Sequence, residues 1–173
     1  LGDVYKRQGL RKVPDNIPND QVLKDNLGKP LTNIPDPFKK FDSFGEHNNE
    51  MLKKFLNKFN FRFTFKSSTE NYKNGIFNKS LIRVAEKYED IMNIILPTLR
   101  EERRKTYCPF LPICPKTGKV LEIPLLEINN KTGKVIFDNS GEKIETNILD
   151  GNCKLQWKVD WAMRWFTFDV DFE

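Results

Sequence analysis

The chain has 173 residues, of which 38% are hydrophobic and 12% aromatic, and this composition excludes a disordered polypeptide and allows a buried core. Its 29 Lys and Arg against 24 Asp and Glu give a net charge of +5, which is compatible with a polyanionic partner but too small to identify one. No apolar run approaches the roughly 18 residues of a membrane span, and an odd number of cysteines indicates free thiols, so we expect a cytoplasmic protein without a membrane partner.

The N-terminal part of the chain predicts little regular structure. Residues 1–8 do not continue any pattern that follows, and we expect them to be a junction artefact outside the fold. Residues 13–38 contain five prolines in 26 positions, which excludes long helices and strands. One short helix is predicted over Asp20–Leu27, with Asn19 as its N-cap and Gly28 as its stop.

Residues 43–65 predict a helix followed by a strand. Ser43 and Glu46 have the spacing of a capping box, and the apolar stripe of the helix continues to Phe59. Phenylalanines then alternate with polar residues, which is typical of a strand with one buried face. These are Phe61, Phe63 and Phe65. A helix and a strand in such close succession fit an α/β unit.

Two helices and a basic run are predicted next. A short helix contains Tyr72, and the longest helix of the chain is predicted over Lys79–Leu96, with Pro97 at its end. Four cations follow within six positions, interrupted by Glu101 and Glu102. They are Arg100, Arg103, Arg104 and Lys105. Such a run is either a solvated face or a site for RNA phosphates, and the sequence leaves both open.

Metal ligation and histidine chemistry have weak support. Cys108 and Cys114 are spaced as one half of a zinc site, but the second pair of ligands is missing. Cys153 and His47 lie far away along the chain. We therefore expect no bound metal. In the alternative in which the chain is a structural zinc domain, Cys108 and Cys114 would bind zinc. A lone histidine such as His47 is more often a packed residue than a catalyst.

A small antiparallel meander is predicted before the C-terminal stretch. Turn signals at Lys116–Lys119, Lys131–Lys134 and Asn139–Gly141 separate segments rich in β-branched residues. The segments are 120–128, 135–138 and 143–149. Each turn glycine stands alone with no helix start after it, which excludes a phosphate-binding glycine loop.

The C-terminal stretch, residues 155–173, contains all three tryptophans. Trp157, Trp161 and Trp165 lie four apart, so a helix through 157–165 places them on one face. Residues 166–172 then alternate Phe or Val with polar residues and predict a strand. Indole faces attract an ammonium group and shield an aliphatic stem, while a carboxylate such as Asp160 supplies the compensating charge. The alternative is that the tryptophans belong to the core.

Three blocks of the sequence resemble one enzyme family. Trp157–Trp165, followed by Asp169–Glu173, closely resembles the central block of class I lysyl-tRNA synthetases. Gly9–Pro14 looks like the segment after the second nucleotide-fold strand of that family. Ile34–Phe38, leading to Ser43–Asn49, looks like its loop and following helix. The blocks are in the same order at matching spacing, and the resemblance runs from about Gly9 to Glu173.

The resemblance implies an α/β fold. It is a Rossmann-like class I synthetase nucleotide-binding fold, incomplete in this chain and interrupted by a small antiparallel β insertion. Residues 9–106 would be part of the catalytic domain with a helical connective segment, and residues 107–150 the β-rich insertion. Residues 151–173 would return to the catalytic domain and form its amino-acid pocket segment.

The resemblance also implies an activity and its substrates. L-Lysine would be activated with ATP and Mg²⁺ and then attached to tRNA(Lys). The basic run at 100–105 would contact the phosphates of the tRNA. The residues that match the family's pocket block are Trp157, Asp160, Trp161 and Arg164. Two alternatives remain: a stand-alone RNA-binding relative without catalysis, or another class I synthetase. The acidic character of residues 160–173 disfavours a glutamyl-tRNA synthetase.

Both ATP signature motifs of this family are missing from the 173 residues. We expect the His-containing motif before Leu1 and the Lys-Ser-containing motif after Glu173, and therefore no catalytic residue within the chain. The purified chain should show no lysine-dependent pyrophosphate exchange, because the groups that stabilise the transferred phosphates are absent. An intact lysyl-tRNA synthetase is the positive control, and exchange by the chain alone would contradict the expectation.

Overall fold

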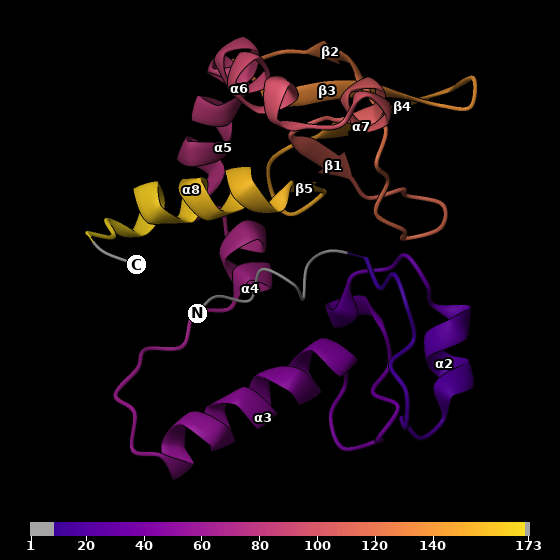
Figure 1. Ribbon diagram of the computed structural model, residues 1–173, viewed down its shortest axis with the longest axis vertical. Coiled ribbons are helices and arrows are strands. Elements are labelled where there is room, and N and C mark those ends of the chain that lie inside the picture. Colours follow the sequence, from indigo (N-terminus) through magenta and orange to yellow (C-terminus); the bar gives the residue numbers. More distant parts are fainter. Residues whose placement is uncertain (1–8, 172–173) are drawn as a thin grey trace. The chain divides into compact units, whose positions relative to one another are not determined.

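The computed structural model describes residues 9–171, which fold as two compact units (Figure 1). Unit 1 contains the residues up to Thr69 together with residues 115–120, and unit 2 contains residues 70–114 and those from 121 onward. The expected junction at 1–8, and Phe172 and Glu173, lie outside the described residues. Within residues 9–171, no helix combines the length and the apolar character needed to cross a membrane.

In unit 1, two short helical elements lie between proline-rich loops. Helix α2 (Asp20–Asp25) confirms the predicted short helix, although it ends two residues earlier, and a 3-10 helix, η1, follows at Leu31–Asn33. The predicted cap is wrong: Asn19 adopts a left-handed conformation with φ 50° and makes no side-chain capping bond. Its amide instead donates to the carbonyl of Pro37 at 2.7 Å, so the side chain fastens a loop. The core of unit 1 contains Leu10, Leu23, Ile34 and Phe44.

Helix α3 (Phe44–Lys58) confirms the capping-box prediction. The hydroxyl of Ser43 accepts a hydrogen bond from the N–H of Glu46 at 3.1 Å. The Glu46 carboxylate reaches back to the N–H of Asp42 at 3.3 Å, one residue before the expected partner. Together these bonds satisfy backbone donors that a helix start leaves unpaired.

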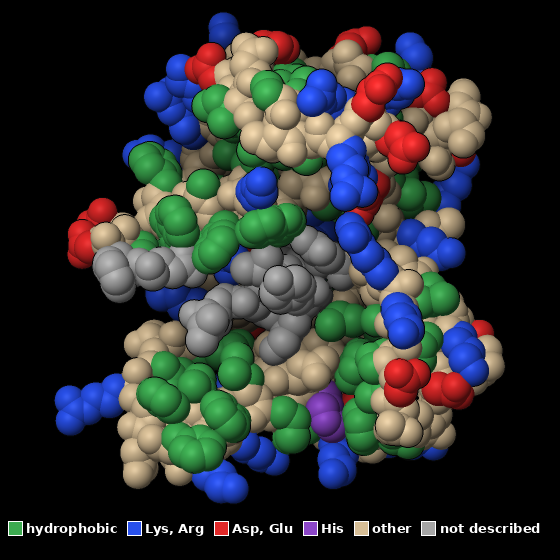
Figure 2. Space-filling view, in the orientation of Figure 1, with side chains coloured by type: hydrophobic (Ala, Val, Ile, Leu, Met, Phe, Trp, Pro, Cys, Tyr) green, Lys and Arg blue, Asp and Glu red, His purple; other side chains and the backbone are tan. Residues whose placement is uncertain are grey.

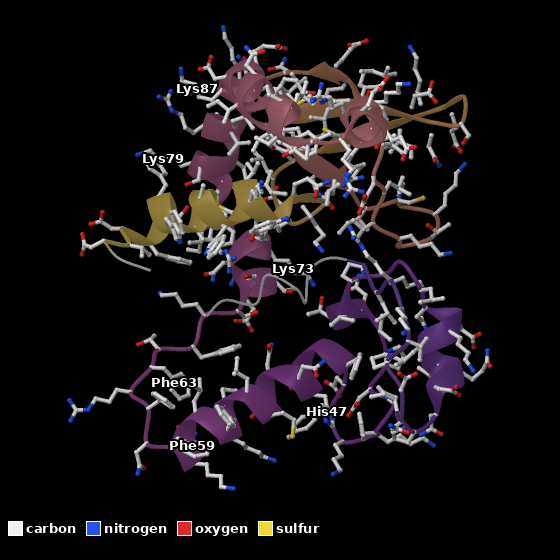
Figure 3. The ribbon with its side chains drawn as sticks, viewed as in Figure 1. His47, Phe59, Phe63, Lys73, Lys79 and Lys87 are labelled. Carbon is white, nitrogen blue, oxygen red and sulfur yellow. The ribbon has the colours of Figure 1, made fainter. Side chains whose placement is uncertain are left out.

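The strand predicted over residues 61–65 is wrong. Residues 61–65 form no helix or strand, and among residues 9–171 no strand pairs with them. Phe61 is 59% exposed and Phe63 37% exposed. Figure 3 labels Phe59 and Phe63, and Figure 2 shows hydrophobic side chains gathered over the end of α3 and the segment that follows it. Alternation in the sequence is typical of a strand, but a strand also needs a hydrogen-bonding neighbour.

The helices of unit 2 differ in one respect from the prediction. Helix α4 (Ser68–Lys73) confirms the short helix that contains Tyr72. The single helix predicted over 79–96 is wrong, because two helices, α5 (Asn78–Glu86) and α6 (Tyr88–Ile95), are separated at Lys87. Lys87 leaves helical geometry with φ −99° and ψ 18°. In Figure 3, Lys79 and Lys87 mark the two ends of α5.

The end of this helical region matches the prediction. A 3-10 helix, η2 (Leu96–Thr98), contains Pro97 and ends α6. Helix α7 (Glu101–Thr106) then carries most of the basic run. The longest helix of the described residues is therefore α3, not the helix predicted at 79–96.

Unit 2 contains two small antiparallel sheets. Strands β2 (Leu125–Ile128), β3 (Lys134–Asn139) and β4 (Glu142–Asn147) confirm the predicted meander, in the order β2-β3-β4. The first strand is shorter than predicted and begins at residue 125 instead of 120. A second sheet pairs β1 (Phe110–Pro112) with β5 (Cys153–Leu155), and this long-range pairing was not predicted.

Helix α8 (Trp157–Phe168) follows β5 directly. It confirms the helix predicted through 157–165, but the strand predicted from 166 is wrong, because the helix continues to Phe168 and ends at Asp169 with φ 51°. Phe168 packs edge-on against Phe77, with ring centroids 5.6 Å apart. Alternating aromatic residues can thus also continue a helix, since Phe168 lies one turn beyond Arg164.

Candidate functional site

The three tryptophans form a ladder along one face of α8. The centroids of Trp157 and Trp161 are 5.7 Å apart, and those of Trp161 and Trp165 are 5.3 Å apart, with tilted rings. Trp157 is 43% exposed and Trp165 is 41% exposed. The core alternative is therefore wrong for Trp157 and Trp165, while Trp161 between them is partly buried. Half-exposed indoles offer π faces and apolar edges to a ligand.

Asp160 and Arg164 lie on the same helix and are buried. Asp160 is 7% exposed and Arg164 is 8% exposed. One carboxylate oxygen of Asp160, Oδ2, lies 3.1 Å from Nε of Arg164 in an ion pair one turn apart. This contact lacks hydrogen-bond geometry, and neither Nε nor Nη2 of Arg164 has a hydrogen-bond partner among the described residues. The structure thus brings together all four residues of the predicted pocket on one helix. The two tryptophans are at least partly exposed to solvent, and Asp160 and Arg164 are buried.

Tyr72 is the residue of this site that the sequence did not predict. Its hydroxyl donates to the other carboxylate oxygen of Asp160, Oδ1, at 2.5 Å. The side chain comes from α4, is fully buried, and packs edge-on against Phe77 at 4.9 Å between ring centroids. The two residues are 88 positions apart, and no local pattern links them. Only the burial of a tyrosine, which requires a partner for its hydroxyl, could have suggested such a contact.

The opposite face of α8 borders an apolar cavity. Its volume is about 300 Å³, and side chains from α5, α6 and α8 line it, among them Val84, Ile91, Ala162 and Phe166. None of the four predicted pocket residues lines this cavity. The cavity and the tryptophan ladder are therefore separate features of the same helix.

The basic run on and before α7 divides into two pairs. Arg103 forms an ion pair with Glu122 at 2.7 Å. Arg104 donates from Nε to the carbonyl of Leu99 at 2.8 Å and so caps a preceding turn. Arg100 and Lys105 are exposed. Two of the four cations are thus engaged in the fold of unit 2.

The cysteines are part of the interior. Cys108, Cys114 and Cys153 are all buried and free of disulfides. Burial raises the pKa of the Cys108 thiol to about 12, so it is protonated at neutral pH and a poor nucleophile. Among residues 9–171, no group of three or more His, Cys, Asp or Glu could hold a metal ion.

His47 is a packed residue in unit 1. Its Nδ1 lies 3.0 Å from Oδ2 of Asp36, and its ring stacks on Phe38 with centroids 4.4 Å apart. Asp36 also accepts hydrogen bonds from the backbone N–H of Phe38, Lys40 and Phe41. Burial acts to raise the pKa of the Asp36 carboxyl, but the bonds from His47 and the backbone outweigh it and hold the pKa below 3.8. The pair orders the loop before α3.

The sequence matches a known family over nearly its whole length. The family model of "tRNA synthetases class I (K)" matches residues 4–173. The chain belongs to this family. It is 53% identical over 166 residues to the lysine–tRNA ligase of Rickettsia bellii (strain OSU 85-389), a match that covers 95% of this chain and 32% of that protein. The corresponding ligase of Rickettsia felis (strain ATCC VR-1525 / URRWXCal2) is 52% identical with the same coverage.

The class I (K) synthetase match includes the whole of the described site. Helix α8 and Tyr72 both lie within residues 4–173. The lysine–tRNA ligase of Rickettsia prowazekii (strain Madrid E) is 51% identical over 166 residues, and the chain covers 31% of its length. The chain therefore spans about a third of the length of these curated relatives, and it is a mixed α/β member of the family with small antiparallel sheets.

Proposed function

We propose that the protein acts in lysyl-tRNA synthesis: activation of L-lysine with ATP, then transfer of the lysyl group to tRNA(Lys). The family match and the lysine–tRNA ligases among the relatives support this activity. The observation that carries it is the tryptophan ladder of α8, because half-exposed indoles suit a ligand with a cationic end and an apolar stem.

The proposed amino-acid pocket consists of Trp157, Asp160, Trp161 and Arg164. Trp157 and Trp161 would cover the four-carbon stem of lysine and face its ammonium group. Asp160 and Arg164 would form the floor of the pocket, since both are buried and paired with each other. A buried pair of this kind orients its helix but leaves little charge for a ligand.

We also propose a Rossmann-like nucleotide-binding fold for the protein. In a Rossmann-like nucleotide-binding fold, residues 61–65 would pair with strands from elsewhere in the protein, which would cover Phe61 and Phe63. The proposed division is 9–106 for the catalytic domain with its connective segment, 107–150 for the β insertion and 151–173 for the pocket segment. ATP would enter with Mg²⁺, which neutralises phosphate charge when bound.

Residues of the basic run would contact tRNA(Lys) in the cytoplasm. Arg100 and Lys105 suit phosphate contacts best, because both are exposed while Arg103 and Arg104 are engaged within unit 2. Arg103 and Arg104 would remain secondary contacts at the edge of the same surface. Glu101 and Glu102 between the cations would weaken the attraction to phosphates, and the exposed cation–phosphate contacts would make binding fall as the salt concentration rises.

Trp157→Ala in a lysine–tRNA ligase that contains this segment should raise the KM for lysine about tenfold. The variant removes an indole face and part of the apolar wall, each worth on the order of 1 kcal/mol in a partly exposed site. The measurement is pyrophosphate exchange as a function of lysine and of ATP. Trp165→Ala is a matched control, since Trp165 has nearly the same exposure and lies outside the proposed pocket. An unchanged lysine KM in Trp157→Ala would refute the assignment.

A further inference from the structure

Both oxygens of the Asp160 carboxylate are already engaged by the protein. Tyr72 donates to Oδ1 at 2.5 Å, and Nε of Arg164 lies 3.1 Å from Oδ2. The side chains of Asp160 and Arg164 are each only 10% exposed. The negative charge of Asp160 is thus balanced within the fold and is not presented to solvent.

The position of Asp160 connects this buried contact to the tryptophans. Asp160 follows Trp157 by three residues on α8, so the two side chains are neighbours one turn apart, with Asp160 buried and Trp157 43% exposed. Tyr72 belongs to α4, a different part of unit 2. The hydrogen bond therefore joins the buried side of α8, one turn from Trp157, to a second helix.

We infer that Tyr72 is a positioning residue of the amino-acid pocket, which acts through Asp160 to fix the indole faces of α8. The inference rests on the proposed lysine pocket and adds a residue from outside the tryptophan block. It also changes the role of Asp160, because the carboxylate holds Tyr72 and Arg164, and the ammonium group of the amino acid meets the indole faces instead of a free carboxylate. Selection for a cation then depends on how accurately the indoles are held.

Tyr72→Phe in a lysine–tRNA ligase that contains this segment tests the inference. It removes only the hydroxyl, and we expect the lysine KM to rise about tenfold with the ATP KM unchanged, as when a hydrogen bond to a charged acceptor is lost. Tyr107→Phe is the matched control, because Tyr107 is buried in the same unit and its hydroxyl has no hydrogen-bond partner among the described residues. In the 173-residue chain, Tyr72→Phe should shift the tryptophan emission maximum, and Tyr107→Phe should not, because all three tryptophans lie on α8.

Tyr72→Phe in an Asp160→Leu, Arg164→Met background shows whether the hydroxyl acts through the carboxylate, because this background has neither an acceptor at position 160 nor an unpaired buried cation. There Tyr72→Phe should raise the lysine KM no further, whereas a further rise would overturn the inference. An unchanged lysine KM in Tyr72→Phe, or an equal rise for lysine and ATP, would also overturn it. If Trp157→Ala raises the lysine KM in those cases, the proposed pocket stands without Tyr72. If neither variant changes the lysine KM, the proposed pocket itself is refuted.

Discussion

Asp160→Ala should lower the free energy of unfolding of unit 2 by about 3–5 kcal/mol. The substitution leaves the Arg164 guanidinium buried without its counter-ion and the Tyr72 hydroxyl without its acceptor. An uncompensated buried charge costs far more than the lost contact itself, because the desolvation of the cation is no longer offset. This is the largest stability effect that we expect for a single side chain in unit 2.

Urea unfolding followed by tryptophan emission measures this effect in unit 2 alone, because all three tryptophans belong to α8. Asp171→Ala is the control, since it removes an exposed carboxylate shortly after the same helix. Replacement of Arg164 by Met in the Asp160→Ala background should restore part of the lost stability by removing the unpaired charge. Equal stability of Asp160→Ala and Asp171→Ala would contradict the buried-pair description.

Asp36→Ala should destabilise unit 1 by on the order of 3 kcal/mol. One carboxylate accepts hydrogen bonds from three backbone N–H groups and contacts His47, so its removal leaves several donors of a partly buried loop without their partner. The ring signals of His47 are a specific probe in NMR, because the chain has one histidine and its ring stacks on Phe38. Loss of its ring-current shift at lower urea concentration would mark the destabilisation.

The same carboxylate gives unit 1 a dependence on acid. Because the pKa of Asp36 is lower in the folded state than its ordinary value of 3.8, its contribution to stability is complete above that value and is lost as the pH falls through the folded pKa. Asp36→Asn should therefore show a shallower loss of stability below about pH 4 than the unchanged chain. Asp42→Asn removes an exposed carboxylate nearby and should keep the full acid dependence.

Local patterns predicted the elements whose stabilising contacts are also local. The capping residues Ser43 and Glu46 interact within one helical turn, so the sequence shows them directly. The meander is similar, because its strands are joined by short turns. The tryptophan ladder is an i, i+4 arrangement and could be predicted for the same reason.

The remaining features depend on contacts between residues far apart in the sequence. Residues 61–65 alternate like a strand, but alternation does not supply a neighbouring strand. The pairing of β1 with β5 and the bond from Tyr72 to Asp160 join segments separated by many tens of residues. For the candidate site, the residues on α8 could be predicted from the sequence, while the bond from the buried Tyr72 to Asp160 could be found only in the structure.

The division of the chain between the two units has a consequence for the order of folding during synthesis. Residues 115–120 belong to unit 1, where the N–H of Val120 donates to the carbonyl of Gly28 at 2.9 Å. The ribosome makes them only after α4 to α7 and β1, on the order of seconds after Thr69 at ordinary rates of translation. Unit 1 can therefore be completed only after residues 70–114 of unit 2 have been synthesised. Unit 2 is completed later still, because it also needs the residues from 121 onward.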